Sequence, residues 1–149
     1  IPLRLVGSEM CIRDSISAFK KSRCLVPISG WYEWKIIDDV KQPFFFKHKE
    51  NQNMFAAGLY WPRSDGSTEF TIITTAAPLE INEVHDRSPL ILDDVSMGIW
   101  LSDDNPEDIH VNISHDFGHI IENYQVTRSV NNPKNNNASL IEEFNEVPF

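Results

Sequence analysis

Aromatic and β-branched residues recur in short runs between turn signals from about position 24 to position 75, and this pattern limits the fold more than any other feature. Such runs, bounded by Gly, Asp, Asn and Pro, are typical of antiparallel strands. The expected strands cover about 24–26, 30–37, 42–48, 53–61 and 68–75. Asp65-Gly66 is a hairpin-type dipeptide before the last of them. Gly58 predicts a bend or a close backbone approach within a strand.

The second half of the sequence changes to short helical patterns. Asp93 is expected to cap the helix that follows it, and Pro106 fits the first turn of another helix. The expected helices cover 16–22, 78–84 and 94–101, with a further one beginning at Pro106, and a late strand covers 124–132. We find no internal repeat and no domain boundary. The pattern predicts an α+β fold, mainly β, with a curved or barrel-like mixed sheet and peripheral short helices.

Composition excludes several classes of protein. The 149 residues suffice for one domain with a core. A net charge of −9 argues against general binding of polyanions, so any contact with nucleic acid needs a local basic surface. Two cysteines do not make a disulfide framework and favour a reducing compartment. No apolar run reaches the roughly 20 residues that span a bilayer, so we expect a cytoplasmic protein without a membrane partner.

The stretch GWYEWK places a carboxylate among aromatic side chains in an expected strand. Alternation puts Glu33 on the same face as Trp31 and Lys35, whereas Tyr32 and Trp34 lie on the other face. Two interpretations remain open. Glu33 can be a solvated side chain paired with Lys35. Alternatively, an aromatic pocket raises its pKa, so that the carboxyl group holds and returns a proton near pH 7.

The segment VHDRSP contains a second group with chemical potential. Histidine is the side chain that titrates near neutrality without perturbation, and the guanidinium of Arg87 suits a phosphate. The alternative is a surface loop in which His85, Asp86 and Arg87 only make local hydrogen bonds. The residues alone do not decide between these two interpretations.

Five segments, taken in their order and spacing, resemble the SRAP (SOS response-associated peptidase) family. They read RCLVPISGWYEWK, QPFFF, MFAAGLYW, FTIITTAAP and VHDRSPLIL. The resemblance extends from about Ala18 to Ile141. It implies a sensor of abasic sites in single-stranded DNA that shields the lesion covalently. In the family, the α-amine and thiol of an N-terminal cysteine capture the aldehyde of the ring-opened sugar as a thiazolidine.

The resemblance also implies roles for individual residues. Glu33 matches the acid/base glutamate, and His85 matches the histidine that assists sugar opening and reversal of the crosslink. Arg87 is expected to hold a phosphate beside the lesion, and Thr75 to hydrogen-bond the sugar. A neighbouring base is expected to stack on Trp34 or Trp31. No cofactor and no metal are implied. The expected partner is single-stranded DNA with abasic sites, and the expected state is a bacterial, cytoplasmic monomer that joins the nucleoid when bound to DNA.

The sequence departs from the family at its beginning. The family opens with an M-C-G-R-type start and continues to an N-A-R-type motif, and neither motif occurs here. Cys11 is followed by Ile12 and lies too close to AFKKSRCLVP, so we do not assign it as the nucleophile. Residues 1–14 are interpreted as a non-native or unstructured leader, and 15–149 as a partial SRAP domain lacking its N-terminal portion. The chain as written is therefore expected to be inactive in crosslinking.

Three other functions were weighed against this one. A thiol peptidase would use Cys24 and His85 as its dyad. A metal site would use His115 and His119, with His110 and Asp116 near, if that segment were helical. The third is a non-catalytic module that binds single-stranded DNA.

Overall fold

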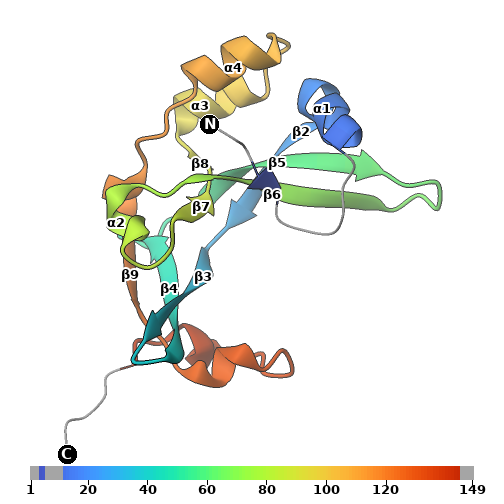
Figure 1. Ribbon diagram of the computed structural model, residues 1–149. Helices are drawn as coiled ribbons and strands as arrows, with labels where there is room; N and C mark the ends of the chain where they lie inside the picture. Colours follow the sequence, from blue (N-terminus) through green and yellow to red (C-terminus); the bar gives the residue numbers. More distant parts are fainter. Residues whose placement is uncertain (1–3, 6–11, 145–149) are drawn as a thin grey trace, which may run out of the picture.

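The computed structural model describes residues 4–5 and 12–144, and two antiparallel sheets organise them (Figure 1). Most of the leader expected at 1–14, including Cys11, lies outside the described residues, so that interpretation stays a prediction. The larger sheet has six strands: β1 (Arg4–Leu5), β2 (Arg23–Ile28), β5 (Met54–Pro62), β6 (Thr68–Ala76), β7 (Arg87–Pro89) and β8 (Ile91–Leu92). Its order is β1-β6-β5-β2, with β7 paired to β6 and β8 to β5.

The smaller sheet has the order β3-β4-β9 and carries the GWYEWK motif. Its strands are β3 (Gly30–Ile37), β4 (Val40–His48) and β9 (Ile121–Gln125). Only Ser29 separates β2 from β3, so the chain leaves one sheet and enters the other within one residue. Figure 1 shows the smaller sheet descending from the larger one, so the described chain is bent.

Short helices lie at the periphery of the sheets. They are α1 (Ile12–Lys21), α2 (Leu79–Asn82), α3 (Asp94–Trp100) and α4 (Pro106–Asn112). Three 3₁₀ turns follow: η1 (Gly118–Ile120), η2 (Arg128–Asn131) and η3 (Ala138–Ile141). The side chain of Asp93 accepts a 2.7 Å hydrogen bond from the amide of Ser96, which confirms the predicted N-cap. No helix in the described part of the chain is long and apolar enough to cross a membrane.

The α+β class with peripheral helices is confirmed, but two finer expectations are not met. The sheets do not close into a barrel, and every strand pair among the described residues is antiparallel rather than mixed. The late strand was predicted at the wrong position, because β9 covers Ile121–Gln125 rather than 124–132. It ends at Gln125, and the side chain of Thr127 then caps η2 by accepting a hydrogen bond from the amide of Ser129.

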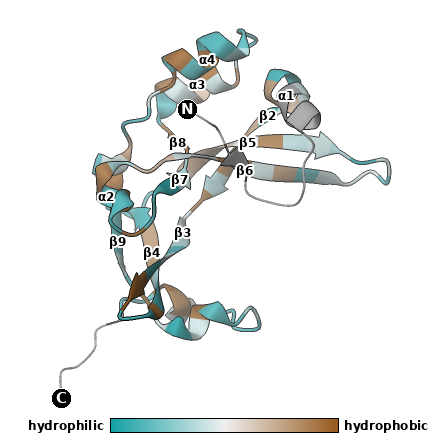
Figure 2. Cartoon of the chain, viewed as in Figure 1, coloured by the Kyte–Doolittle hydropathy of each residue, from teal (hydrophilic) through white to brown (hydrophobic). Residues whose placement is uncertain are grey.

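The turns explain why the hairpins form where they do. Asp38 and Asp39 join β3 to β4 with positive φ angles of 48° and 61°, the backbone of a tight two-residue turn. Gly66 has a φ of 85° in the predicted hairpin turn. A Cβ atom on Gly58 would lie 2.7 Å from Val26 Cγ2, which confirms the predicted close approach. Figure 2 shows a hydrophobic end to β3, where Ile36 is 73% exposed.

The core lies where the helices pack on the larger sheet. Trp100 at the end of α3 is fully buried, and its Nε1 donates to the carbonyl of Cys24 at 2.9 Å. Arg23 at the start of β2 donates to the carbonyls of Phe19, Trp100 and Ser102. One guanidinium thus ties α1 and α3 to the sheet. This use explains a basic residue at the start of β2 without any contact to DNA.

Candidate functional site

Glu33 lies in the middle of β3, on the face that meets the loop before β7. Its cross-strand neighbour is Phe44, and the next pair on this face, Trp31 and Phe46, stacks with ring centroids 5.1 Å apart. The Glu33 side chain is 20% exposed. Aromatic residues therefore line the approach to a carboxylate that is largely withdrawn from water.

The partner of Glu33 is His85. The Oε2 atom of Glu33 lies 3.9 Å from Nε2 of His85, whose side chain is 42% exposed. No ion pair within 4.0 Å joins Glu33 to Lys35 in the described part of the chain. The described structure thus does not contain the Glu33–Lys35 pair of the first interpretation. Two segments that are 52 positions apart in sequence instead meet through a carboxylate and an imidazole.

The electrostatics of Glu33 favour its protonated form. Burial raises the pKa of the Glu33 carboxyl group. The positive charge of His85 acts in the opposite direction, and the carboxylate of Asp86 raises the pKa further. The net direction is upward. A carboxyl group with a raised pKa can both donate and accept a proton closer to neutral pH than an ordinary glutamate can.

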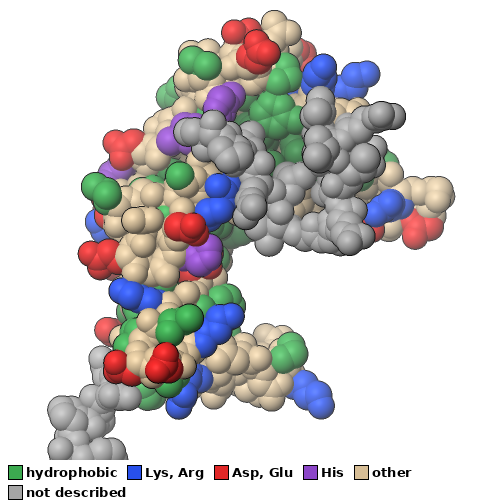
Figure 3. Space-filling view, in the orientation of Figure 1, with side chains coloured by type: hydrophobic (Ala, Val, Ile, Leu, Met, Phe, Trp, Pro, Cys, Tyr) green, Lys and Arg blue, Asp and Glu red, His purple; other side chains and the backbone are tan. Residues whose placement is uncertain are grey.

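Arg87 lies beside this pair, and Thr74 on β6 holds its guanidinium. Nε of Arg87 donates to Oγ1 of Thr74 at 3.1 Å, and Nη2 donates to the Thr74 carbonyl oxygen at 2.6 Å. Figure 3 shows basic, acidic and histidine side chains close together on the inner side of the bend between the two sheets. Glu33 thus comes from β3, His85 from the loop before β7, and Arg87 from the first position of β7.

The comparisons with known proteins identify the family of the chain. The family model described as SOS response associated peptidase (SRAP) matches residues 15–133. The chain belongs to the SRAP family. It is 39% identical over 128 residues to the abasic site processing protein YoqW of Bacillus subtilis, covering 80% of this chain and 57% of YoqW. It is 32% identical over 133 residues to the abasic site processing protein YedK of Escherichia coli, covering 83% of this chain and 59% of YedK.

A solved structure supports the SRAP fold. A protein from Bacteroides thetaiotaomicron superposes with a TM-score of 0.74 at 22% identity, covering 86% of this chain and 59% of that one. At this identity the likeness concerns the fold. The SRAP chain spans somewhat more than half the length of these relatives.

Thr75 and its neighbour Thr74 have different partners in the structure. Thr75, the expected sugar contact, is 2% exposed, and its Oγ1 lies 3.4 Å from Nδ1 of His115. Thr74, one position earlier, contacts Arg87 instead. Because successive residues of a strand point to opposite faces, the threonine beside Arg87 is Thr74. Alternation along FTIITTAAP indicates two faces but does not say which of them meets Arg87.

The two tryptophans of the motif also lie on different faces of β3. Trp31 shares the Glu33 face, and its buried Nε1 has no hydrogen-bond partner among the described residues. Trp34 lies on the other face, where Nε1 donates to Oδ1 of Asn131 at 2.7 Å. Of the two, the geometry brings Trp31 to the Glu33 side, and base stacking on either one stays a prediction.

Neither the thiol-peptidase site nor the metal site has the features that its chemistry needs. Burial raises the pKa of the Cys24 thiol, whereas a thiol nucleophile is activated by a lowered pKa. His115 and His119 do not share a helix, because the chain between them has no α-helical turn. No three potential metal ligands from His, Cys, Asp or Glu converge anywhere in residues 4–5 and 12–144. Nδ1 of His119 instead faces Oδ1 of Asp116 at 3.8 Å.

Proposed function

We propose that the protein to which this chain belongs captures abasic sites in single-stranded DNA as a covalent adduct. The observation that carries the proposal is the Glu33–His85 pair, with its carboxylate and imidazole 3.9 Å apart, in a chain of the SRAP family. YoqW and YedK are named abasic site processing proteins. The pair supplies the proton transfers that such a capture requires.

The chemistry needs several proton transfers in sequence. The hemiacetal of the abasic sugar opens to an aldehyde. The α-amine of an N-terminal cysteine adds to the aldehyde carbon, and loss of water gives a Schiff base. The thiol of the same cysteine then adds to the imine carbon and closes a thiazolidine, so the net reaction releases one water. Glu33 and His85 together can accept a proton from one group and deliver it to the next.

Arg87 is the proposed phosphate contact beside the lesion. Its hydrogen bonds hold the guanidinium on Thr74 of β6, and Arg87 itself lies two positions after His85 in the chain. A preoriented guanidinium recognises a phosphate through parallel N–H donors at a lower entropic cost than a free side chain. Neutralising a phosphate also makes binding depend on salt. Thr75 and the stacking tryptophans remain secondary proposals.

The proposal includes a cellular setting. We expect the protein to act as a cytoplasmic monomer that associates with the nucleoid when it is engaged on DNA. In the family, the peptidase label fits removal of the protein's own initiator methionine, which would expose the cysteine. Lyase-like chemistry would arise through the same Schiff base.

The test uses the gene product expressed from its native start codon and a single-stranded oligonucleotide with one abasic site. We expect a heat-stable adduct on a denaturing gel, and none with an intact oligonucleotide. His85→Ala should slow both formation and reversal of the adduct, roughly 100-fold or more for a group that transfers protons. Asp116→Asn is the control, because it removes a carboxylate beside an exposed histidine outside the site.

Two results would contradict the proposal. Absence of any adduct, with binding of the abasic oligonucleotide retained in fluorescence anisotropy, would leave a non-catalytic binding module. Unchanged rates of capture and release in both Glu33→Gln and His85→Ala would remove these residues from the chemistry.

A further inference from the structure

The imidazole of His85 has an unusual set of neighbours at Nδ1. The backbone amide nitrogen of Arg87 lies 3.1 Å from this atom and donates to it. The carbonyl oxygen of the same residue lies 3.0 Å from it. A ring nitrogen accepts a hydrogen bond when unprotonated and donates one when protonated. One residue therefore offers Nδ1 both a donor and an acceptor.

These two contacts serve different protonation states. In the neutral ring with its proton on Nε2, Nδ1 accepts from the Arg87 amide, and the Nε2 proton faces Glu33. In the charged ring, Nδ1 carries a proton and donates to the Arg87 carbonyl. Neither state needs a new rotamer. The ring can thus gain or lose a proton without moving away from Glu33.

Asp86 adds a charge to this arrangement. Its Oδ1 lies 3.5 Å from Nδ1 of His85, and the side chain is 86% exposed. The charged groups around the ring are Glu33 from β3 on the Nε2 side, Asp86 on the Nδ1 side, and Arg87 from the same loop. The Arg87 guanidinium is held on Thr74. A charged imidazolium therefore lies between two carboxylates.

We propose that Asp86 is a positioning residue which, together with the Arg87 backbone, stabilises His85 in its charged state within reach of Glu33. This inference rests on the proposed function, since it assigns to Asp86 the balance between the two forms of a proton-transferring histidine. Asp86 acts through His85 and does not itself touch the sugar. The proposal explains why an exposed carboxylate occupies the position between His85 and Arg87.

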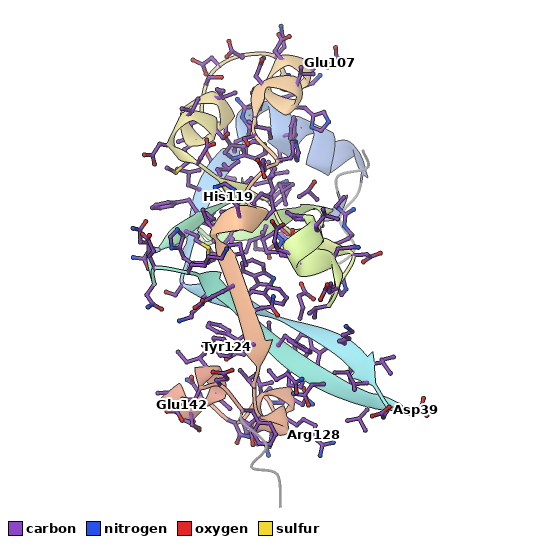
Figure 4. The ribbon with its side chains drawn as sticks, turned by 90° about the vertical axis from the view of Figure 1, so that its left-hand side faces the viewer. Asp39, Glu107, His119, Tyr124, Arg128 and Glu142 are labelled. Carbon is purple, nitrogen blue, oxygen red and sulfur yellow. The ribbon has the colours of Figure 1, made fainter. Side chains whose placement is uncertain are left out.

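The chain contains its own control for a generic carboxylate effect. Oδ1 of Asp116 lies 3.8 Å from Nδ1 of His119, and both side chains are exposed. Figure 4 places His119 at the upper end of β9, on the segment that enters the smaller sheet. The two pairs have similar distances, but only the His85 pair faces Glu33. Removing each carboxylate in turn separates a role in the site from ordinary surface electrostatics.

The first experiment follows the ring nitrogens by NMR and does not require activity. The chain, labelled with ¹⁵N-histidine, is compared with Asp86→Asn and Asp116→Asn at pH 6. We expect Asp86→Asn to lower the ratio of charged to neutral His85 about two- to fourfold, the size expected for an exposed charge pair. Asp116→Asn should leave His85 unchanged. Adding 1 M salt should shrink the difference between wild type and Asp86→Asn, because salt screens exposed charges.

The second experiment measures adduct formation against pH in the gene product expressed from its native start. Asp86→Asn should move the profile toward lower pH, because less His85 is charged at any given pH and Glu33 ionises more readily. Asp86→Glu should restore part of the shift, and Asp116→Asn should not move it.

The outcomes distinguish the two proposals. An unchanged His85 ratio in Asp86→Asn, or an equal change in Asp116→Asn, would overturn the role of Asp86 whatever the activity. Absence of any adduct in the wild type would overturn the proposed function, while the NMR result would still decide whether Asp86 stabilises the charged ring.

Discussion

The polar groups on the two faces of β3 have different partners. On one face, Glu33 is withdrawn from water and lies 3.9 Å from His85, which belongs to the loop before β7. On the opposite face, Trp34 donates to Asn131 at 2.7 Å, and the hydroxyl of Tyr32 donates to the carbonyl of Leu140 at 3.3 Å. The segment after β9 thus supplies hydrogen-bond partners for the Tyr32 and Trp34 side chains.

This difference separates a site from a scaffold within a single strand. On the Tyr32–Trp34 face, the side chains form hydrogen bonds with neutral groups of the same chain. These hydrogen bonds stabilise the fold and need no proton transfer. The Glu33 face contains a carboxyl group whose raised pKa reflects incomplete compensation for burial. Substitutions on the Glu33 face should therefore change capture of DNA and the pH dependence of stability, whereas substitutions on the Trp34 face should change the free energy of unfolding. Four substitutions test this expectation.

The largest effect is expected for Glu33→Gln. Capture of abasic DNA should fall roughly 100-fold or more, because the amide cannot transfer the proton. Folding stability should respond in the opposite direction. Because the pKa of Glu33 is raised by folding, the contribution of its protonated carboxyl group to folding stability is fully present below the unfolded-state pKa. This contribution is lost as the pH rises through the folded-state pKa. The variant should thus be more stable than wild type at pH 7 and about equal near pH 4, by urea unfolding. Lower stability at pH 7 would contradict this account of burial.

The next largest effect is expected on the Tyr32–Trp34 face of β3. Trp34→Ala should cost about 2 kcal/mol of unfolding free energy, since a half-buried ring loses less than a core tryptophan. The ring also packs near Tyr32, with centroids 6.5 Å apart, and under Lys41 at 5.6 Å. Urea unfolding measures the loss. The rate of adduct formation should stay within about twofold of wild type on an abasic oligonucleotide without bases next to the lesion, because such a substrate offers no neighbouring base to stack on Trp34. A large loss of rate on this substrate would indicate that Trp34 takes part in the chemistry.

A smaller effect is expected for Asn131→Ala. This change removes the acceptor for Trp34 Nε1 and leaves the ring in place. Loss of one hydrogen bond at a partly exposed site should cost about 1 kcal/mol. Asn131→Asp, which keeps an acceptor, is the matched control and should cost less. An equal cost for both would indicate that packing, rather than this hydrogen bond, holds the segment.

The smallest effect is expected for Lys35→Ala. Lys35 shares the Glu33 face, but His85 is the group that pairs with Glu33. Stability should change by less than about 0.5 kcal/mol, as for ordinary surface substitutions. The pH dependence of stability should keep the shape that Glu33 gives it. A large change in that shape would restore the interpretation of a Glu33–Lys35 pair.

The sequence predicted the strands well because aromatic and β-branched residues are concentrated in them and turn residues bound them. GWYEWK and QPFFF are two such runs, so β3 and β4 follow directly, and the period of two along β3 places Glu33 on the face of Trp31. The division into two sheets could not be predicted, since one exposed residue, Ser29, marks the change from β2 to β3. The end of β9 was missed because the cap at Thr127 favours a 3₁₀ turn within a β-rich sequence.

The candidate site was predictable in part. The resemblance to the SRAP family selected Glu33 and His85, and the structure brings their side chains together. The sugar contact of Thr75 stays a prediction. The contact of Thr74 with Arg87 could not be predicted, because alternation gives two faces without their orientation relative to Arg87. The contacts of His85 with the Arg87 backbone leave no signal in the sequence, since they depend on loop geometry and not on side-chain type.

The change of sheet at Ser29 has a mechanical consequence. Glu33 belongs to the three-stranded sheet and His85 leads into a strand of the six-stranded sheet, so the distance between them depends on the angle between two separately hydrogen-bonded units. A small rotation about the junction would lengthen that distance while every ladder within each sheet stayed intact. The distance between the two side chains therefore changes with the angle between the two sheets. Any ligand that altered this angle would change the distance between the Glu33 carboxylate and the His85 imidazole without touching either residue.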